Sequence, residues 1–377
     1  MRVTVSVHGR FHGFDLAREL HRQGHLAGLL TTYPRFAVKP HVGDIEGLAT
    51  APALEVRRRV CQRLPGLCKN LDETVARRFG RFAADRLPPC DLLVGWSSAT
   101  LEAIPAAHAM GACVILERGS THIMHQTDVL TNVYSRAGQD FAATSAQIVA
   151  RELAEYEAAD AIAVPSSYAA QTFIDRGVSR DKVLINPYGV NLEQFSPAPE
   201  RRRGKPRILF VGRVGYRKGV PELLDAFAPL ADLAELHLVG PIDPLINLLG
   251  HANVHAVGAL SMQALPGQYH GADIFCLPSW EEGFPLVLLQ AMASGLPVVA
   301  SDATGAADII TDGVEGVVVP AGDKEALGDA LRRLVDDPDR RMLMGQAARA
   351  RVQDGFGWAD YGRRAIDMYT KVLAGGP

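Results

Sequence analysis

Basic side chains follow a strand-like run of this chain at the position where a phosphate could be bound. The apolar run from Ile208 ends at Gly212, and the turn after it carries Arg213, Arg217 and Lys218. Arginine presents a planar fork to two phosphate oxygens, and lysine acts as a mobile point charge. Ligands of open α/β sheets lie beyond the carboxyl ends of the strands, so this turn predicts a diphosphate-binding loop. It is neither a P-loop nor a Gly-x-Gly-x-x-Gly fingerprint, and the alternative is a solvated basic turn.

A second stretch, residues 279–301, places an acidic turn before an apolar segment. Pro285 fits the first position of a helix, and Gly295 fits the position just past its end. The residues between them are apolar except for Gln290, so this helix is expected to be buried. Glu282 then lies at the helix N-terminus, a setting that suits phosphate. A buried amide needs partners, so Gln290 is expected to meet the same ligand. The alternative is an ordinary helix–strand unit with a glutamate in its turn.

Both stretches resemble the signature segments of the retaining glycosyltransferases of family 4, which have the GT-B fold. That family carries Val-Gly-Arg, four residues and Lys-Gly, which match residues 211–219 here. It also carries Glu, Gly-Phe-Pro and a second Glu eight positions after the first, followed by Ala-Met-Ala-x-Gly-x-Pro-Val. Residues 282–298 match this pattern, except that Gln290 replaces the second Glu. Glutamine keeps an acceptor oxygen and adds donors but loses the charge. The resemblance covers nearly all of residues 183–370 and is thin before them.

The resemblance implies a role for each matched residue. Arg213 and Lys218 would neutralise the donor pyrophosphate, Glu282 would hold the donor sugar, and Gln290 would contact the ribose. These cations and the helix dipoles would stabilise the leaving group, so neither a metal nor a cofactor is expected. With His122, Glu282, Arg213 and Lys218 form the expected catalytic group. The expected donor-binding residues are Gly212, Arg213, Lys218, Val257, Glu282, Gly283, Phe284, Pro285, Leu286 and Gln290.

Two loops in the N-terminal half carry further candidates. Residues 8–14 follow the first strand, where the family closes a glycine-rich loop over the donor. Residues 117–126 form a loop after the strand at 114–116, where family members often have a histidine near the donor sugar, and His122 is the candidate. The alternatives are a polar loop that begins a helix and a structural histidine, and no third ligand for zinc is evident. Candidates for acceptor contact or loop closure are His8, Gly9, Arg10, His12, Gly13, Arg118 and His125.

Strand-like and helical runs alternate along the chain, which predicts α/β layers on parallel sheets. A length of 377 residues favours two domains. We expect two doubly wound, Rossmann-like domains that face a central cleft. The expected division is residues 1–198 on the acceptor side, a linker at 199–206, a nucleotide-sugar domain at 207–356, and a last helix at 357–377 that crosses back. Two of the expected helices run from Leu16, capped by Asp15, and from Ser261 to His270.

Composition narrows the setting of the protein. The net charge of −3 argues against nucleic-acid binding. No apolar run approaches the roughly 20 residues that span a bilayer, and the chain goes straight into a strand at Val3, so neither a membrane span nor a signal peptide is expected. Five scattered cysteines include Cys113 and Cys276, which are expected to be buried thiols. The expected location is the cytoplasm, with peripheral contact at the inner membrane face.

Residues 57–86 carry nine Arg or Lys against three Asp or Glu. Apolar residues recur there at helical spacing, namely Leu64, Leu67, Leu71, Val75, Phe79 and Phe82. The segment indicates either two amphipathic helices with a solvated basic face or a surface that contacts an anionic membrane or a phosphate-bearing acceptor.

The expected function is the transfer of a sugar, with retention, from a UDP- or GDP-type sugar to the hydroxyl of a saccharide or lipid-linked saccharide. Such a reaction would serve the synthesis of cell-surface polysaccharide or glycolipid. The alternatives are a nucleotide-sugar epimerase on the same fold and a non-catalytic partner protein that binds sugar nucleotides.

Overall fold

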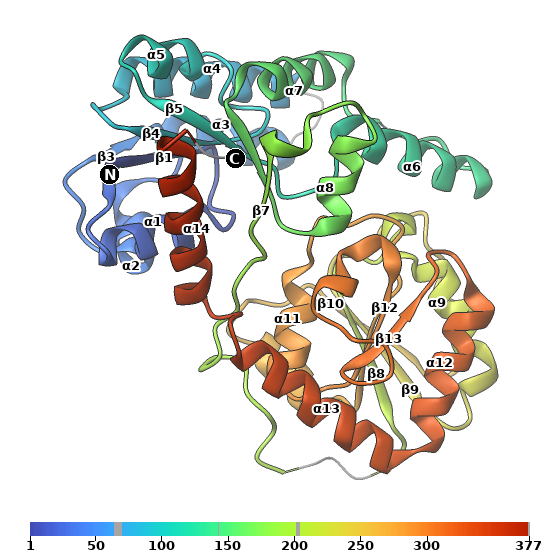
Figure 1. Cartoon of the computed structure of the whole chain (residues 1–377). Coiled ribbons are helices and arrows are strands. Elements are labelled where there is room, and N and C mark those ends of the chain that lie inside the picture. Colours follow the sequence, from blue (N-terminus) through green and yellow to red (C-terminus); the bar gives the residue numbers. More distant parts are fainter. Residues whose placement is uncertain (64–69, 142, 201–203, 376–377) are drawn as a thin grey trace.

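The computed structural model describes residues 1–63, 70–141, 143–200 and 204–375. It consists of two α/β units, each built on one parallel sheet (Figure 1), and this confirms the predicted Rossmann-like fold class. The N-terminal sheet has the order β3-β2-β1-β4-β5-β6-β7. Its strands are Val3–Val7 (β1), Leu26–Thr31 (β2), Leu48–Thr50 (β3), Leu92–Trp96 (β4), Cys113–Glu117 (β5), Ala161–Val164 (β6) and Val183–Ile185 (β7).

Helices cover both faces of the N-terminal sheet. Alternate strand residues point to opposite faces, and they divide the core accordingly: Val5 and Val94 join one apolar cluster, and Leu93 and Val114 join another. The helices are Gly13–Arg22 (α1), Arg35–Val42 (α2), Pro52–Arg63 (α3), Leu71–Arg86 (α4), Ala103–Ala109 (α5), Ile123–Arg136 (α6), Ala146–Ala158 (α7) and Ser167–Ile174 (α8).

The C-terminal sheet has the order β10-β9-β8-β11-β12-β13. Its strands are Arg207–Val211 (β8), Glu235–Val239 (β9), Val254–Gly258 (β10), Ile274–Leu277 (β11), Val298–Ser301 (β12) and Gly316–Val319 (β13). Its helices are Val220–Phe227 (α9), Leu265–His270 (α10), Leu286–Ala293 (α11), Lys324–Asp336 (α12) and Pro338–Gln353 (α13). As the apolar sequence predicts, α11 is buried from Leu288 to Ala293.

The chain passes between the two sheets twice. It leaves the N-terminal sheet after β7 and returns through the last helix, Trp358–Leu373 (α14), which packs on α1 (Figure 1). Gly362 permits this packing, because a Cβ there would lie 2.4 Å from the Cβ of Glu19. The two passages run side by side, and the amide of Val190 donates to the carbonyl of Phe356 at 2.8 Å. The carboxyl ends of the two sheets face each other, because Gly283, beyond β11, packs closely against Gly119, beyond β5.

Several element boundaries differ from the expectations. Helix α1 starts at Gly13, with His12 as its N-cap and Asp15 inside the first turn, because the amide of Leu16 already donates to the carbonyl of His12 at 3.0 Å. Helix α11 starts one residue late, so Pro285 is its N-cap in an extended conformation. The helix expected from Ser261 starts only at Leu265, where a proline occupies the first turn.

Other expectations concern the linker, the cysteines and the basic segment. Residues 201–203 of the linker, as well as Leu64 and Leu67, lie outside the described residues. Cys276 is buried, but Cys113 is partly exposed because it begins its strand. The described residues of this segment form parts of two helices, 57–63 in α3 and 71–86 in α4. Among the described helices, none is both long and apolar enough to span a bilayer.

Candidate functional site

The two sequence motifs of the C-terminal domain meet at the carboxyl ends of β8 and β11. The loop after β8 ends at Gly219, which has a φ of +67°, and a Cβ there would lie 2.0 Å from the carbonyl oxygen of Pro278. A side chain is therefore excluded, and the two loops approach closely. The amide of Trp280 donates to the carbonyl of Arg217 at 2.9 Å, which joins the loops through their backbones.

This approach brings Lys218 and Glu282 together in an ion pair. Both side chains are largely buried, with 19% and 12% of their surfaces exposed. The amide of Glu282 is fixed in turn by the carbonyl of Ala303 at 2.9 Å, beyond the end of β12. The predicted phosphate-binding lysine and the predicted sugar-binding glutamate thus share one small region.

Arg213 projects from the same loop but is exposed. Within the described residues it has no hydrogen bond or ion pair. Burial raises the pKa of Tyr134 of α6, and the positive charge of Arg213 opposes this rise. Gly212, at the end of β8, donates its amide to the carbonyl of Val239 at 2.9 Å. The structure therefore places one unpaired guanidinium at the sheet edge that carries the Lys218–Glu282 pair.

The residues after Glu282 lie against the N-terminal domain. Gly283 packs on the backbone of the N-terminal domain, since a Cβ on Gly283 would lie 2.4 Å from the carbonyl oxygen of Gly119. The carbonyl of Gly283 accepts a hydrogen bond from the Ser166 hydroxyl at 2.5 Å. The ring of Phe284 is buried and meets the edge of Tyr188, with 6.2 Å between centroids. This turn therefore forms part of a closed contact between the domains.

Gln290 lies on α11 and is nearly buried, as the sequence predicts. Its Oε1 accepts a hydrogen bond from the Tyr269 hydroxyl at 2.9 Å. Gln290 also lines a groove of about 910 Å³ together with Leu286. Arg10 and Phe11, from the loop after β1, line the same groove. The groove is thus shared by both domains and the two segments that connect them. No described residue accepts a hydrogen bond from the side-chain N–H groups of Gln290, so these donors can meet another partner.

The other candidates in the loop after β1 contact neighbouring residues of the N-terminal domain. His12 lies between the rings of Trp96 and Tyr188, and its Nε2 is 3.3 Å from a carboxylate oxygen of Glu117. Burial, with the charges of Arg58 and Arg151, lowers the pKa of His8 to about 4. A Cβ on Gly9 would meet the ring of Phe11, and one on Gly13 would meet Val7 and Trp96. Only Arg10 of the candidates in this loop lines the groove.

The loop after β5 is shorter than expected, because α6 begins at Ile123. His122 is the N-cap of this helix, and its Nδ1 accepts the amide of Met124 at 3.2 Å. Its ring packs against Tyr156 and Phe173. Burial, with the nearby arginine charges, lowers the pKa of His122 to about 4. This placement favours a structural role for His122 over the catalytic one that the resemblance implied.

Arg118 and His125 also have internal partners. The buried guanidinium of Arg118 donates to Glu152 Oε1 at 3.0 Å and to the carbonyl oxygen of Thr121 at 3.1 Å. The Nε2 of His125 lies 3.1 Å from the Tyr168 hydroxyl. Arg118 thus joins the end of β5 to α7, and His125 joins α6 to α8.

Glu281 is a residue that the sequence reasoning missed. Its side chain is fully buried between the domains and forms an ion pair of 2.7 Å with Arg217. It also accepts hydrogen bonds from the Thr121 hydroxyl at 2.7 Å, the Ser120 hydroxyl at 2.8 Å and the Gln126 amide at 3.0 Å. Burial alone would raise the pKa of Glu281, but Arg217 and these hydrogen bonds outweigh it and lower the pKa to about 2. These residues, which we call the Glu281 clasp, join the domains beside the Lys218–Glu282 pair.

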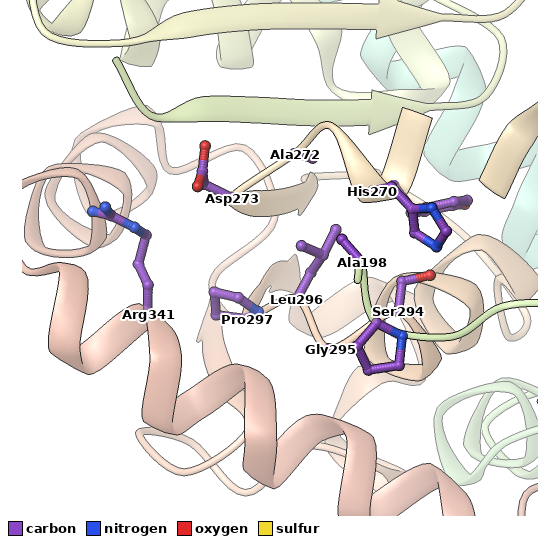
Figure 2. A pocket seen from close by; sticks show the side chains of 11 residues that line it. Ala198, His270, Ala272, Asp273, Ser294, Gly295, Leu296, Pro297 and Arg341 are labelled. Carbon is purple, nitrogen blue, oxygen red and sulfur yellow. The ribbon is translucent and has the colours of Figure 1, made fainter. Parts of the chain in front are cut away.

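Two other features lie apart from this region. Val257 is on edge strand β10 and is partly exposed, and it does not line the groove. A small cavity of about 70 Å³ lies between Asp273, Leu296 and Arg341 (Figure 2). Asp273 lies one residue before β11 and Leu296 lies two residues before β12, so this cavity is at the amino ends of the strands. Ligands of open α/β sheets bind at the opposite ends.

Asp337 and Asp339 do not line the groove. Asp337 is the N-cap of α13 and accepts the amide of Arg340 at 2.9 Å, so this turn caps a helix.

Comparison with known proteins agrees with the geometry of the C-terminal domain. Residues 193–351 match the family described as glycosyl transferases group 1. The chain is 33% identical over 238 residues to an MMP α-(1→4)-mannosyltransferase of Mycolicibacterium hassiacum, a match that covers 60% of this chain and 56% of the relative. It is also 33% identical over 285 residues to a D-inositol 3-phosphate glycosyltransferase of Kribbella flavida, covering 67% and 66%. The chain thus spans between half and two thirds of these relatives.

Solved structures share the fold over almost the whole chain. A sucrose-phosphate synthase from Thermosynechococcus elongatus superimposes with a TM-score of 0.70, 23% identity and 99% of each chain covered. Anabaena Alr3699/HepE in complex with UDP gives a TM-score of 0.71 at 15% identity, with 98% of this chain and 100% of that chain covered. At these identities the likeness shows the GT-B fold alone.

Proposed function

We propose that this protein is a retaining, metal-independent glycosyltransferase that moves a sugar from a nucleotide-diphosphate sugar to an acceptor hydroxyl. The observation that carries the proposal is the meeting of Lys218 and Glu282 at the carboxyl edge of a sheet, in the domain that matches group 1 glycosyl transferases. The names of the similar relatives, a mannosyltransferase among them, support the same reaction class. The open groove shared by both domains, which has Gln290 but not Arg213, Lys218 or Glu282 in its lining, supplies room for the nucleoside part of the donor.

In this proposal the cations meet the donor diphosphate. Arg213 is exposed and has no ion pair among the described residues, so it binds a phosphate without first losing a partner. Lys218 exchanges a carboxylate oxygen of Glu282 for a phosphate oxygen, and Glu282 then accepts a hydrogen bond from a sugar hydroxyl. The two cations stabilise the charge that develops as the diphosphate leaves.

The reaction proceeds on one face of the sugar. The acceptor oxygen bonds to the anomeric carbon on the side from which the diphosphate oxygen departs, and the acceptor proton passes to that departing oxygen. The products are a glycoside of retained configuration and a nucleoside diphosphate. No protein nucleophile takes part, and the contact between the domains limits access of water to the donor.

A panel of sugar nucleotides tests this proposal. The protein is incubated with UDP- and GDP-linked glucose, mannose and N-acetylglucosamine, with and without EDTA, and products are followed by NMR and chromatography. We expect slow release of nucleoside diphosphate and free sugar with one donor, unaffected by EDTA, and a retained anomer once an acceptor is added. A new sugar nucleotide would indicate an epimerase, and binding without turnover would indicate a partner protein. Either result would overturn the proposal.

We also propose that the acceptor is lipid-linked, that α3 and α4 contact an anionic inner membrane face, and that the reaction serves polysaccharide or glycolipid synthesis. Arg77, Arg78 and Arg81 of α4 are exposed, and they have no ion pair in the part of the chain that the structure describes. Each basic residue near such a surface contributes about 1 kcal/mol. We expect sedimentation with vesicles containing phosphatidylserine, loss of binding at high salt, and weaker binding of the triple variant with Gln at these positions. Equal binding to neutral vesicles would contradict this part.

A further inference from the structure

Three side chains that can bind metal gather on one face of the C-terminal sheet, apart from the groove. They are Glu235 and His237 of β9 and His255 of β10, and one ligand atom from each lies within 4.8 Å of the others. Strands β9 and β10 are parallel neighbours, and His255 is in register with His237. None of the three residues lines the groove.

Strand geometry explains why the three side chains share a face. Residues two positions apart on a strand point to the same side, so Glu235 and His237 do so. His255, opposite His237 on the neighbouring strand, points to that side as well, and the two imidazole centroids are 4.7 Å apart. The other positions of β9, Leu236 and Leu238, are buried in the core. The backbone therefore holds two imidazoles and a carboxylate together without help from loops.

We propose that Glu235, His237 and His255 form an accessory binding site for a divalent transition-metal ion of the zinc class. Zinc binds imidazole nitrogen and carboxylate oxygen at about 2.0–2.2 Å in tetrahedral geometry, which separates ligand atoms by about 3.3–3.6 Å. The Nε2 of His237 and the Oε2 of Glu235 are 3.5 Å apart. The exposed imidazole of His255 closes the remaining gap by side-chain rotation. Magnesium and calcium prefer ligand sets made of oxygen, so two imidazoles argue against them.

The access and charge of the site fit a metal that binds at the surface. The connection from β9 to β10, residues 240–253, contains no helix, and β10 is the outer strand of the sheet. Arg207 lies beside the site, and its guanidinium is 3.2 Å from Glu235 Oε2. This cation competes with a metal ion for the carboxylate, so replacing Arg207 with a neutral residue should strengthen metal binding.

A bound ion would hold the outer strand to the sheet. Among the described strands, β10 pairs only with β9 and so presents an unpaired edge, which proteins commonly protect from association with other chains. A metal that binds only the folded protein also stabilises it in proportion to the logarithm of metal concentration. The site is independent of the proposed sugar transfer, because its residues belong neither to the groove nor to the Lys218–Glu282 pair.

Zinc titration of the metal-stripped, untagged full chain tests the site. We expect calorimetry to show one zinc per chain with a Kd of about 1 μM or tighter, and zinc to raise the Tm. His255→Ala should weaken binding at least tenfold and abolish the rise in Tm. His255 is exposed and lies at the sheet edge, so this variant should remain folded. His21→Ala is the matched control, since His21 is an exposed histidine of the other domain, and it should bind zinc as the natural protein does.

Two further variants sharpen the result. Arg207→Gln should bind zinc more tightly, and Glu235→Gln more weakly. Cobalt binding should give no sulfur charge-transfer band, which separates this site from the cysteine thiols. The proposal is overturned if ~100 μM zinc does not bind, or if His255→Ala binds zinc as tightly as the natural protein does. Sugar transfer measured on His255→Ala at saturating donor tests the proposed function separately.

Discussion

The two strand-end loops that face each other across the cleft use their charged residues in different ways. After β5, the buried Arg118 donates to four acceptors, including the carboxylate of Glu152. After β8, the exposed Arg213 has no hydrogen bond or ion pair among the described residues. A ligand would have to dismantle a buried network to reach Arg118, but it can bind Arg213 directly. Arg213, which a ligand can reach without breaking a buried network, is therefore the better ligand-binding candidate of these two arginines.

Replacing each of these two arginines by methionine is the strongest test of the comparison. Arg118→Met leaves Glu152 buried without its cation, and breaking a buried ion pair in this way costs about 3–5 kcal/mol. We expect a large fall in Tm by differential scanning fluorimetry. Arg213→Met, the matched control, should keep the natural Tm and lose turnover. If Arg118→Met kept the natural Tm while the Tm of Arg213→Met fell, the comparison would be wrong.

The Glu281 clasp predicts a pH dependence. The folded pKa of about 2 lies below the ordinary value of 4.5, so the charged carboxylate stabilises the protein above pH 4.5 and this contribution is lost as the pH falls toward 2. The shift corresponds to about 3 kcal/mol. Glu281→Gln should therefore have a lower Tm than the natural protein at pH 7. Its Tm should also fall less than that of the natural protein between pH 5 and pH 3. An unchanged pH profile would show that the clasp does not hold the domains together.

The clasp also shows what the sequence could not reveal. The alternation of strands and helices could be predicted, because apolar periodicity and Gly or Pro at the boundaries are local signals, but the short α2 and β3 were not. The Lys218–Glu282 pair could be predicted because each residue lies in a recognisable segment. Glu281 accepts hydrogen bonds from Ser120 and Gln126, which are 161 and 155 positions away, and no local pattern indicates such partners. The capping position of His122 is equally hidden in the sequence, because it depends on where α6 begins.

Lys218, in the loop after β8, provides the next test of the comparison. Lys218→Ala should lower turnover at least tenfold, which is roughly 1.4 kcal/mol of barrier, without unfolding the protein. Lys324→Ala removes another lysine of the same domain, which pairs with Asp225 at 3.1 Å, and should leave turnover unchanged. Steady-state kinetics with the donor found in the panel measure both. Equal rates for the two variants would remove the loop after β8 from the proposed mechanism.

His122 tests the opposite side with a smaller effect. Asparagine is a good N-cap, so His122→Asn should keep the amide of Met124 bonded and should change turnover by less than about threefold. A histidine that transferred a proton in catalysis would instead be worth about a hundredfold or more. The pH–rate profile gives a second readout, and it should be the same for the variant and the natural protein. A large loss of turnover with an unchanged Tm would restore His122 to the catalytic group.

The smallest effect is expected at Gln290, where this chain departs from the family pattern. The Tyr269 hydroxyl donates to Gln290 Oε1, and it can donate equally to a carboxylate, which leaves the second oxygen for a ribose hydroxyl. Gln290→Glu should therefore leave kcat/KM for the donor equal or slightly higher. Tyr269→Phe, which takes the hydrogen bond from Oε1, should raise the donor KM in both backgrounds. If Gln290→Glu abolished activity while Tyr269→Phe did not, the amide N–H groups would be the essential contact, because only they are lost in the first variant and kept in the second.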